Sequence, residues 1–292
     1  MMRVRIRKKV IMENMLKQFS DEQIETLKAW GDLQGGIKRL GGGSEGEAFK
    51  VGDKVLKITT SDTEAQSAAA LIPLDHPNIY DISKVGHIGP NRYAIIYDYL
   101  DEPSAEIGEV TKYVWDLVDR RRTGSPTNAP YRWTEQSMDQ VKQVIDTLIA
   151  NQDKLIQPNL KKSAWNMPEK FRDLLRNAGI TDKYVLEVFP LIARVIENDM
   201  SIDLTKLTGK TKSQYSDKYS HGIVDYLKAL KDDPRLEILN DLFLALTFME
   251  KRGIHFVDLS GGNIKEKDGK VVIIDLGYTT KTPDVKIEKV SL

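Results

Sequence analysis

The alternation of apolar and polar residues predicts short strands in the first hundred residues of the chain. Apolar and polar residues alternate at 49–51 and 54–58, on either side of a Gly-Asp turn at 52–53. Residues 63–74 carry apolar positions at helical spacing, and residues 93–100 form a longer apolar run. This order predicts short antiparallel strands with one helix between them.

Longer segments with apolar residues at helical spacing follow after residue 140. Apolar residues recur at helical spacing through 141–149, 184–196 and 236–249. The third of these runs begins after Asp233, a favourable N-cap followed by a first-turn proline, and ends near Gly253. All three runs are expected to be buried helices.

Two further elements are predicted before the first glycine-rich turn. Ser20 caps a short helix that reaches Trp30 and packs on the small sheet. Residues 1–9 are basic and alternate with apolar positions, which favours an edge strand with a solvated charged face. A basic patch for RNA is the alternative interpretation of the same residues.

A glycine-rich segment lies between two of the predicted strands. Residues 41–46 read Gly-Gly-Gly-Ser-Glu-Gly, which fits G-x-G-x-x-G, and a strand resumes immediately afterwards. A dinucleotide-binding fingerprint would open a helix at this point. A hairpin of glycines instead lets backbone N–H groups approach a phosphate, because no Cβ atoms stand in the way.

A second group of polar residues lies near the end of the chain. Residues 256–263 read Phe-Val-Asp-Leu-Ser-Gly-Gly-Asn, and Asp275 follows a strand predicted at 270–274. The turn at 267–269 lets the chain double back, so that Asp275 comes near Asn263. Carboxylate and amide oxygens of this kind are the hard ligands that magnesium binds.

The joint order of these parts resembles the protein-kinase-like superfamily, over about residues 37–100 and 233–280. The resemblance implies an α+β, bilobal fold with a small antiparallel-sheet lobe and a mostly helical lobe. The small lobe would comprise 1–100, including an N-terminal extension at 1–36, and the helical lobe would comprise 101–292. The compact form is similar to bacterial and bacteriophage kinase-like proteins and to aminoglycoside phosphotransferases.

The resemblance also implies a role for each residue of the nucleotide site. Lys57 would contact the α and β phosphates of ATP and pair with Glu64, for which Asp62 and Gln66 are alternatives. The backbone from Asp98 to Leu100 would receive the adenine edge. The glycines that would cover the triphosphate are Gly41, Gly43 and Gly46.

The same resemblance implies the catalytic and metal-binding roles. Asp258 would orient the acceptor hydroxyl and take its proton, while Asn263 and Asp275 would ligate Mg²⁺. The chain therefore carries candidate residues for each step of phosphoryl transfer.

Several residues depart from the protein-kinase pattern. Phe256 and Val257 stand where those enzymes carry His-Arg, so we expect no switch through a phosphorylated activation loop. Ser260 replaces the usual lysine, as in small-molecule phosphotransferases. Only 15 residues follow Gly277, which leaves no room for an activation segment, and we expect the insertion at about 103–232 to supply most of the helical lobe.

Composition narrows the class of protein. With 292 residues, 40% hydrophobic and 29% charged, the chain can bury one core in each lobe. It has no cysteine, which favours a reducing, cytoplasmic location, and no apolar run long enough for a membrane span. Its formal net charge of zero gives no argument for nucleic-acid binding.

Together these features predict an ATP- and magnesium-dependent phosphotransferase, and we expect an atypical serine/threonine kinase with a protein substrate. A small-molecule kinase of the aminoglycoside or choline type is the first alternative, favoured by Ser260 and the missing activation segment. A pseudokinase that acts as an interaction module is the second, although the retained site residues argue against it. Transfer of AMP by a reversed nucleotide is the third.

Overall fold

The computed structural model describes residues 16–43, 45–72, 74–122, 131–150, 228 and 231–292. The chain divides into two compact units, one of Met1–Ser104 with Phe248–Leu292 and the other of Ala105–Thr247. The lobe boundary at residue 100 stays a prediction. The strand expected at 1–9 and the helix expected at 184–196 lie outside the described residues.

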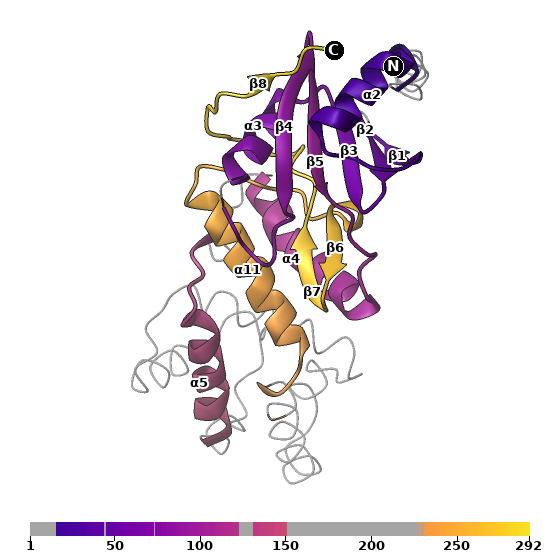
Figure 1. Ribbon diagram of the computed structural model, residues 1–292. Coiled ribbons are helices and arrows are strands. Elements are labelled where there is room, and N and C mark those ends of the chain that lie inside the picture. Colours follow the sequence, from indigo (N-terminus) through magenta and orange to yellow (C-terminus); the bar gives the residue numbers. More distant parts are fainter. Residues whose placement is uncertain (1–15, 44, 73, 123–130, 151–227, 229–230) are drawn as a thin grey trace, which may run out of the picture. The chain divides into compact units, whose positions relative to one another are not determined.

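The first unit contains a six-stranded sheet in the order β1-β2-β3-β5-β4-β8. Neighbouring strands from β1 to β4 pair antiparallel, and β8 joins β4 in parallel (Figure 1). The strands are β1 (Ile37–Gly42), β2 (Gly46–Val51), β3 (Lys54–Thr59), β4 (Ile82–Gly89), β5 (Arg92–Asp98) and β8 (Glu288–Lys289). The predicted antiparallel sheet is thereby confirmed, and its Gly-Asp turn joins β2 to β3 with Gly52 at a φ of 65°.

The predicted N-terminal helix is confirmed as α2 (Asp21–Trp30), which follows a short 3-10 turn, η1 (Leu16–Gln18). Ser20 and Gln23 form a reciprocal capping box at its start. Leu27 is fully buried in a cluster with apolar side chains of the sheet, among them Phe49 and Leu56. Burial of this apolar face holds α2 on the sheet.

The helix predicted at 63–74 is α3 (Asp62–Leu71), which packs beside β4 (Figure 1). Ser61 is its N-cap, and the Ser61 side chain accepts the Glu64 N–H at 3.3 Å. The helix ends at Leu71, earlier than predicted, with Ile72 as a C-cap that still has helical backbone angles. Pro73 follows Ile72 in the sequence and has no N–H with which to continue the helical hydrogen bonds.

The predicted turn and strand near the end of the chain form a hairpin of β6 (Ile264–Lys267) and β7 (Lys270–Ile273), directly after η3 (Gly261–Asn263). Asp268 and Gly269 form the turn with φ of 52° and 76°. The Asn78 side chain donates to Val271 O at 3.0 Å, and the Tyr80 N–H donates to Ile273 O at 3.0 Å. These bonds join the hairpin to the segment that leads into β4.

The described part of the second unit is helical, as predicted. Its helices are α4 (Ala105–Arg122), α5 (Ser137–Ala150) and α11 (Arg235–Glu250). The last residues of α11, from Phe248 on, belong to the first unit. Trp133 is buried with its ring 5.0 Å from Phe243, and its Nε1–H donates to Asn240 Oδ1 at 2.8 Å. The Asp233 cap is confirmed, since its Oδ1 accepts the Arg235 N–H at 2.9 Å. No described helix is both long and apolar enough to cross a bilayer.

Candidate active site

Lys57 lies at the centre of the candidate site and is paired with two carboxylates. It is on β3, opposite Ala48 of β2 and Ile95 of β5, and its side chain is only 14% exposed. Its Nζ lies 2.5 Å from Glu64 Oε1 and 2.8 Å from Asp275 Oδ2. Burial disfavours the ammonium, but the two carboxylates outweigh it and raise the pKa of Lys57 above its usual value.

Glu64 is the predicted partner of Lys57, and the structure places it there rather than Asp62 or Gln66. It lies in the first turn of α3 and is 1% exposed. Burial raises the pKa of Glu64 to about 7, Lys57 opposes this shift, and Asp275 adds to it. Protonation of Glu64 near neutral pH therefore weakens its pairing with Lys57.

Asp275 lies two residues after the end of β7, and its carboxylate faces Lys57. Its Oδ1 accepts the Gly277 N–H at 2.9 Å while its Oδ2 binds Lys57. Burial alone would raise the pKa of Asp275, but Lys57 and the Gly277 N–H hold it below its usual value. Asp275 is therefore a carboxylate at neutral pH, the form that binds a metal ion.

A closed loop carries Asp258 and Asn263. Asp258 Oδ1 accepts the Ser260 N–H at 3.0 Å, and the carbonyl of Asp258 accepts the Asn263 Nδ2–H at 3.0 Å. The Ile274 N–H then donates to Asn263 O at 2.9 Å. This chain of hydrogen bonds fixes the loop next to the residue that precedes Asp275, as the predicted doubling back requires.

The three predicted glycines differ in their surroundings. A Cβ at Gly41 or Gly43 would meet nothing within 4 Å, whereas a Cβ at Gly46 would lie 2.5 Å from Ile58 O. The turn between Gly43 and Gly46 is closed by a 2.9 Å hydrogen bond and is anchored where Glu45 O accepts the Thr60 N–H at 2.7 Å. Gly46 is therefore required by packing, and the other two leave open space.

Gly46→Ala is expected to lower the free energy of unfolding by about 1–3 kcal/mol, because the added methyl group meets a backbone carbonyl. Gly41→Ala is the matched control and should change it by less than about 0.5 kcal/mol. Urea unfolding of both variants measures the difference. Equal stabilities would contradict this account of Gly46.

The predicted hinge leaves β5 at Asp98. The Asp98 carboxylate is held 2.5 Å from Lys54 and 3.6 Å from Lys267, so its side chain has a structural partner on each side. The Tyr99 N–H donates to Asp53 O at 2.8 Å. Within the described part of the chain, the Leu100 N–H donates no hydrogen bond.

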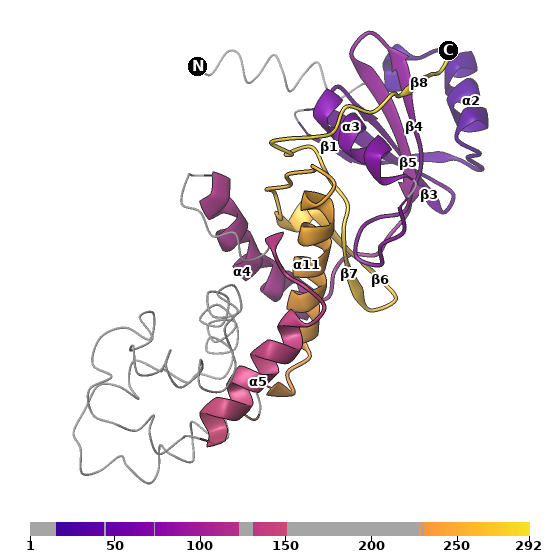
Figure 2. The ribbon, with the colours of Figure 1, turned by 90° about the vertical axis from the view of Figure 1, so that its left-hand side faces the viewer.

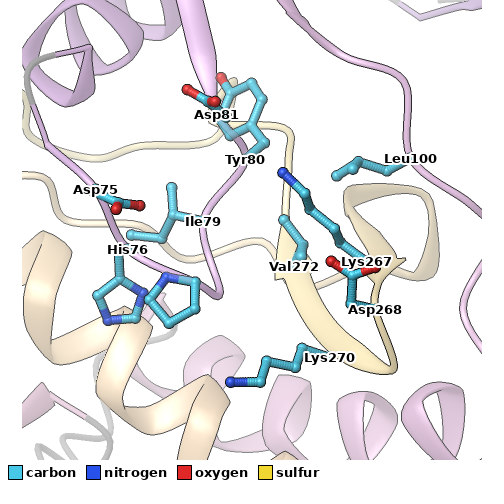
Figure 3. Close-up of a pocket in the computed structure, with 11 residues that line it drawn as sticks. Asp75, His76, Ile79, Tyr80, Asp81, Leu100, Lys267, Asp268, Lys270 and Val272 are labelled. Carbon is cyan, nitrogen blue, oxygen red and sulfur yellow. The ribbon is translucent and has the colours of Figure 1, made fainter. Parts of the chain in front are cut away.

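A cavity of about 280 Å³ lies beside the β6–β7 hairpin (Figure 3). Of the predicted site residues, only Leu100 lines it. Its other lining residues are Asp75, His76, Pro77, Ile79, Tyr80, Asp81, Lys267, Asp268, Lys270 and Val272. This cavity is therefore distinct from the group formed by Lys57, Glu64 and Asp275.

The sequence did not reveal two tyrosines that interact electrostatically with the group formed by Lys57, Glu64 and Asp275. Tyr80 and Tyr97 are buried, with ring centroids 5.0 Å apart. Burial raises the pKa of both phenols, and Glu64 and Asp275 contribute to the shift. The Tyr80 hydroxyl is buried without a hydrogen-bond partner in the described structure. Apolar positions in β5 and before β4 predict burial, but not the neighbours of the hydroxyl groups.

Glu64 is expected to impose an acid limb on activity. Because its carboxylate form pairs with Lys57, kcat/KM for ATP should rise as the pH increases through about 7, the pKa to which burial raises Glu64. Glu64→Gln should lower kcat/KM and remove this limb, since the amide does not titrate. Rate profiles from about pH 5.5 to about 9 test both statements. An acid limb that persists in Glu64→Gln would assign it to another group.

Comparisons with known proteins give no match to a protein-family model or to a curated protein. Among solved structures, the chain is similar to the apo form of a thermostable mutant of aminoglycoside phosphotransferase APH(4)-Ia, with 12% identity, a TM-score of 0.33 and coverage of 89% of this chain and 72% of that one. A complex of such a mutant with ADP and hygromycin B gives 10% identity, a TM-score of 0.30 and the same coverage.

The streptomycin–ATP complex of APH(2'')-IIa gives 13% identity and a TM-score of 0.29, over 90% of this chain and 72% of that one. Aminoglycoside phosphotransferases are among the proteins to which the sequence motifs were similar. Because these TM-scores are low, we base the functional proposal on the geometry of the site itself.

Proposed function

We propose that the protein is a phosphotransferase that uses ATP and magnesium to phosphorylate a hydroxyl group. The observation that carries this proposal is the double pairing of Lys57, 2.5 Å from Glu64 and 2.8 Å from Asp275. A lysine on the third strand, paired with a glutamate on the following helix and facing an aspartate beyond the catalytic loop, is the arrangement that positions a triphosphate in kinases.

The nucleotide would lie between the glycine-rich turn and this lysine. Lys57 would donate to the α and β phosphates, while Glu64 keeps the ammonium oriented. The open space beside Gly41 and Gly43 leaves room for phosphate oxygens, although the Gly43 N–H itself donates to Gly46 O at 2.9 Å. The Leu100 N–H and the nearby backbone would receive the adenine edge.

The donor set fits magnesium. Among the described residues no cluster of three or more His, Cys, Asp or Glu side chains has the arrangement of a metal site. Magnesium in phosphotransferases is held by one or two carboxylates together with phosphate oxygens, and Asp275 and the Asn263 amide oxygen supply such a set. When bound, magnesium neutralises charge on the transferred phosphoryl group.

Asp258 would act on the acceptor. The Ser260 N–H donates to Asp258 Oδ1 and orients the carboxylate. The Asn263 side-chain amide donates to the Asp258 carbonyl and fixes the loop that carries both residues. In the transfer, the acceptor hydroxyl gives its proton to the Asp258 carboxylate and its oxygen bonds to the γ phosphorus. The bond from that phosphorus to the bridging oxygen breaks, and ADP leaves with the electron pair.

Two classes of acceptor are proposed. A serine or threonine of a protein is the acceptor predicted from the overall resemblance. A small-molecule acceptor is favoured by Ser260, which stands where protein kinases usually carry a lysine and whose N–H donates to Asp258 Oδ1 at 3.0 Å.

Incubation with magnesium and ATP labelled on either the γ or the α phosphate tests the proposal. Label from the γ position on a protein or on a small molecule of a cell extract supports phosphotransfer and identifies the acceptor class. Chelation of magnesium is expected to abolish it. Transfer of the α label would replace the proposal by AMP transfer, and the absence of any turnover would replace it by a pseudokinase.

A further inference from the structure

One continuous stretch of chain connects Asp275 to the helix that carries Glu64. Residues 278–281 first pair with 255–257, immediately before Asp258. Residues 282–290, here named the strap, then run along α3 and join β4 as β8 (Figure 2). Both carboxylate partners of Lys57 are therefore linked through this stretch.

The first half of the strap is bonded to α3 within one turn of Glu64. The Ser67 hydroxyl donates to Thr282 Oγ1 at 3.0 Å, and the Val285 N–H donates to Gln66 Oε1 at 2.7 Å. Ser67 is fully buried, at 0% exposure. A buried hydroxyl that loses its partner is costly, so these bonds resist displacement of the helix from the strap.

The second half of the strap is fixed to the sheet. The Val290 N–H donates to His87 O at 2.9 Å, and the Trp30 indole N–H donates to Glu288 Oε1 at 2.7 Å. A Cβ at Gly86 would lie 2.5 Å from Val290 Cγ2 and 2.7 Å from the Trp30 ring, so the three residues pack tightly. The strap is therefore attached to α3 and, beyond it, to the sheet that carries Lys57.

We propose that the strap holds α3 in the position at which Glu64 meets Lys57, and that Gln66, Ser67 and Thr282 are positioning residues for phosphotransfer. The catalytic part of this inference rests on the proposed function. Movement of the helix that bears the glutamate controls activity in kinases, and phosphorylation of an activation segment often supplies the control. Here the contacts of the strap supply the same restraint within the unit.

A purely structural strap would contribute stability alone, whereas a positioning strap also determines kcat. Thr282→Val keeps the shape of the side chain and removes its hydroxyl, which breaks the bond to Ser67. We expect a fall in kcat of about tenfold, with the KM for ATP changed by less than about twofold. Thr26→Val is the matched control, because its hydroxyl bonds within α2 to Glu22 O and is exposed.

The absence of native cysteine allows a rescue experiment. The Ser67 and Thr282 hydroxyl oxygens are 3.0 Å apart, so the double variant Ser67→Cys/Thr282→Cys places two thiols near each other, and mass spectrometry shows whether they form a disulfide. Oxidation should restore kcat to within about twofold of the unmodified protein, and reduction should lower it again. Oxidation of either single variant should leave kcat unchanged.

Amide hydrogen exchange provides a readout that does not depend on turnover. In Thr282→Val, the amides of α3 should exchange faster, while those of α2 keep their protection. Unchanged exchange in α3 would overturn the proposal. A wild-type kcat in Thr282→Val, in a protein that Lys57→Met inactivates, would overturn its catalytic half. Absence of turnover in the wild-type protein would instead overturn the proposed function, and exchange would still decide whether the strap holds α3.

Discussion

Asp258→Asn is expected to lower kcat by about 10²-fold to 10⁴-fold, the range for loss of a general base. The substitution keeps an oxygen at Oδ1 that accepts the Ser260 N–H, so the loop retains its shape. It removes the group that takes the proton of the acceptor hydroxyl. The affinity for ATP and the free energy of unfolding should therefore remain close to those of the wild-type protein.

Asp268→Asn is the matched control for this variant. Asp268 forms the β6–β7 turn with a φ of 52°, a conformation that asparagine adopts readily. Steady-state rates at saturating ATP, with nucleotide binding measured by calorimetry, separate the catalytic effect from binding. A kcat within about twofold of the wild-type value would remove Asp258 from the mechanism.

Asp275→Asn should lower kcat by about 10²-fold to 10³-fold, as expected when one preorganised electrostatic contact to the transferred group is lost. Its Oδ1 can still accept the Gly277 N–H, so the backbone is preserved. Loss of the charge weakens magnesium binding and leaves Lys57 with Glu64 as its carboxylate partner in the described site.

A second effect distinguishes this account of Asp275 from general damage. Asp275 contributes to the raised pKa of Glu64, so its neutralisation should move the acid limb of kcat/KM below the limb of the wild-type protein. The rate profile is compared with that of Asp268→Asn. If kcat and the pH of the acid limb both stay at their wild-type values in Asp275→Asn, the role of Asp275 as metal ligand and as neighbour of Glu64 is contradicted.

Much of the first unit follows from local patterns in the sequence. The Lys57–Glu64 pair was predicted from the resemblance to kinases, although these two residues are closer in the sequence than their counterparts in protein kinases. The structure explains the short spacing, because β3 ends at Thr59 and α3 begins at Asp62, which places Glu64 in the first helical turn. Capping by Ser61 and the end of α3 before Pro73 are local properties of the same kind.

The contacts that complete the site are separated by much longer stretches of chain. Lys57 and Asp275 are 218 residues apart, and Ser67 and Thr282 are 215 apart. Hydrophobic periodicity predicts each element but does not determine which loop meets which helix, so the direct Lys57–Asp275 pair and the strap were not predicted. The unpartnered Tyr80 hydroxyl is a similar case, since its surroundings come from tertiary packing.

The central claim is that Lys57, Asn263 and Asp275 hold a metal–triphosphate. A crystal structure with a non-hydrolysable ATP analogue and Mn²⁺ in place of Mg²⁺ tests it directly, because manganese is located by its anomalous scattering. We expect a manganese peak bound by the Asn263 amide oxygen and an Asp275 carboxylate oxygen, with phosphate oxygens beside Lys57. Manganese or triphosphate bound elsewhere, with these three side chains unoccupied at saturating ligand, would contradict the account.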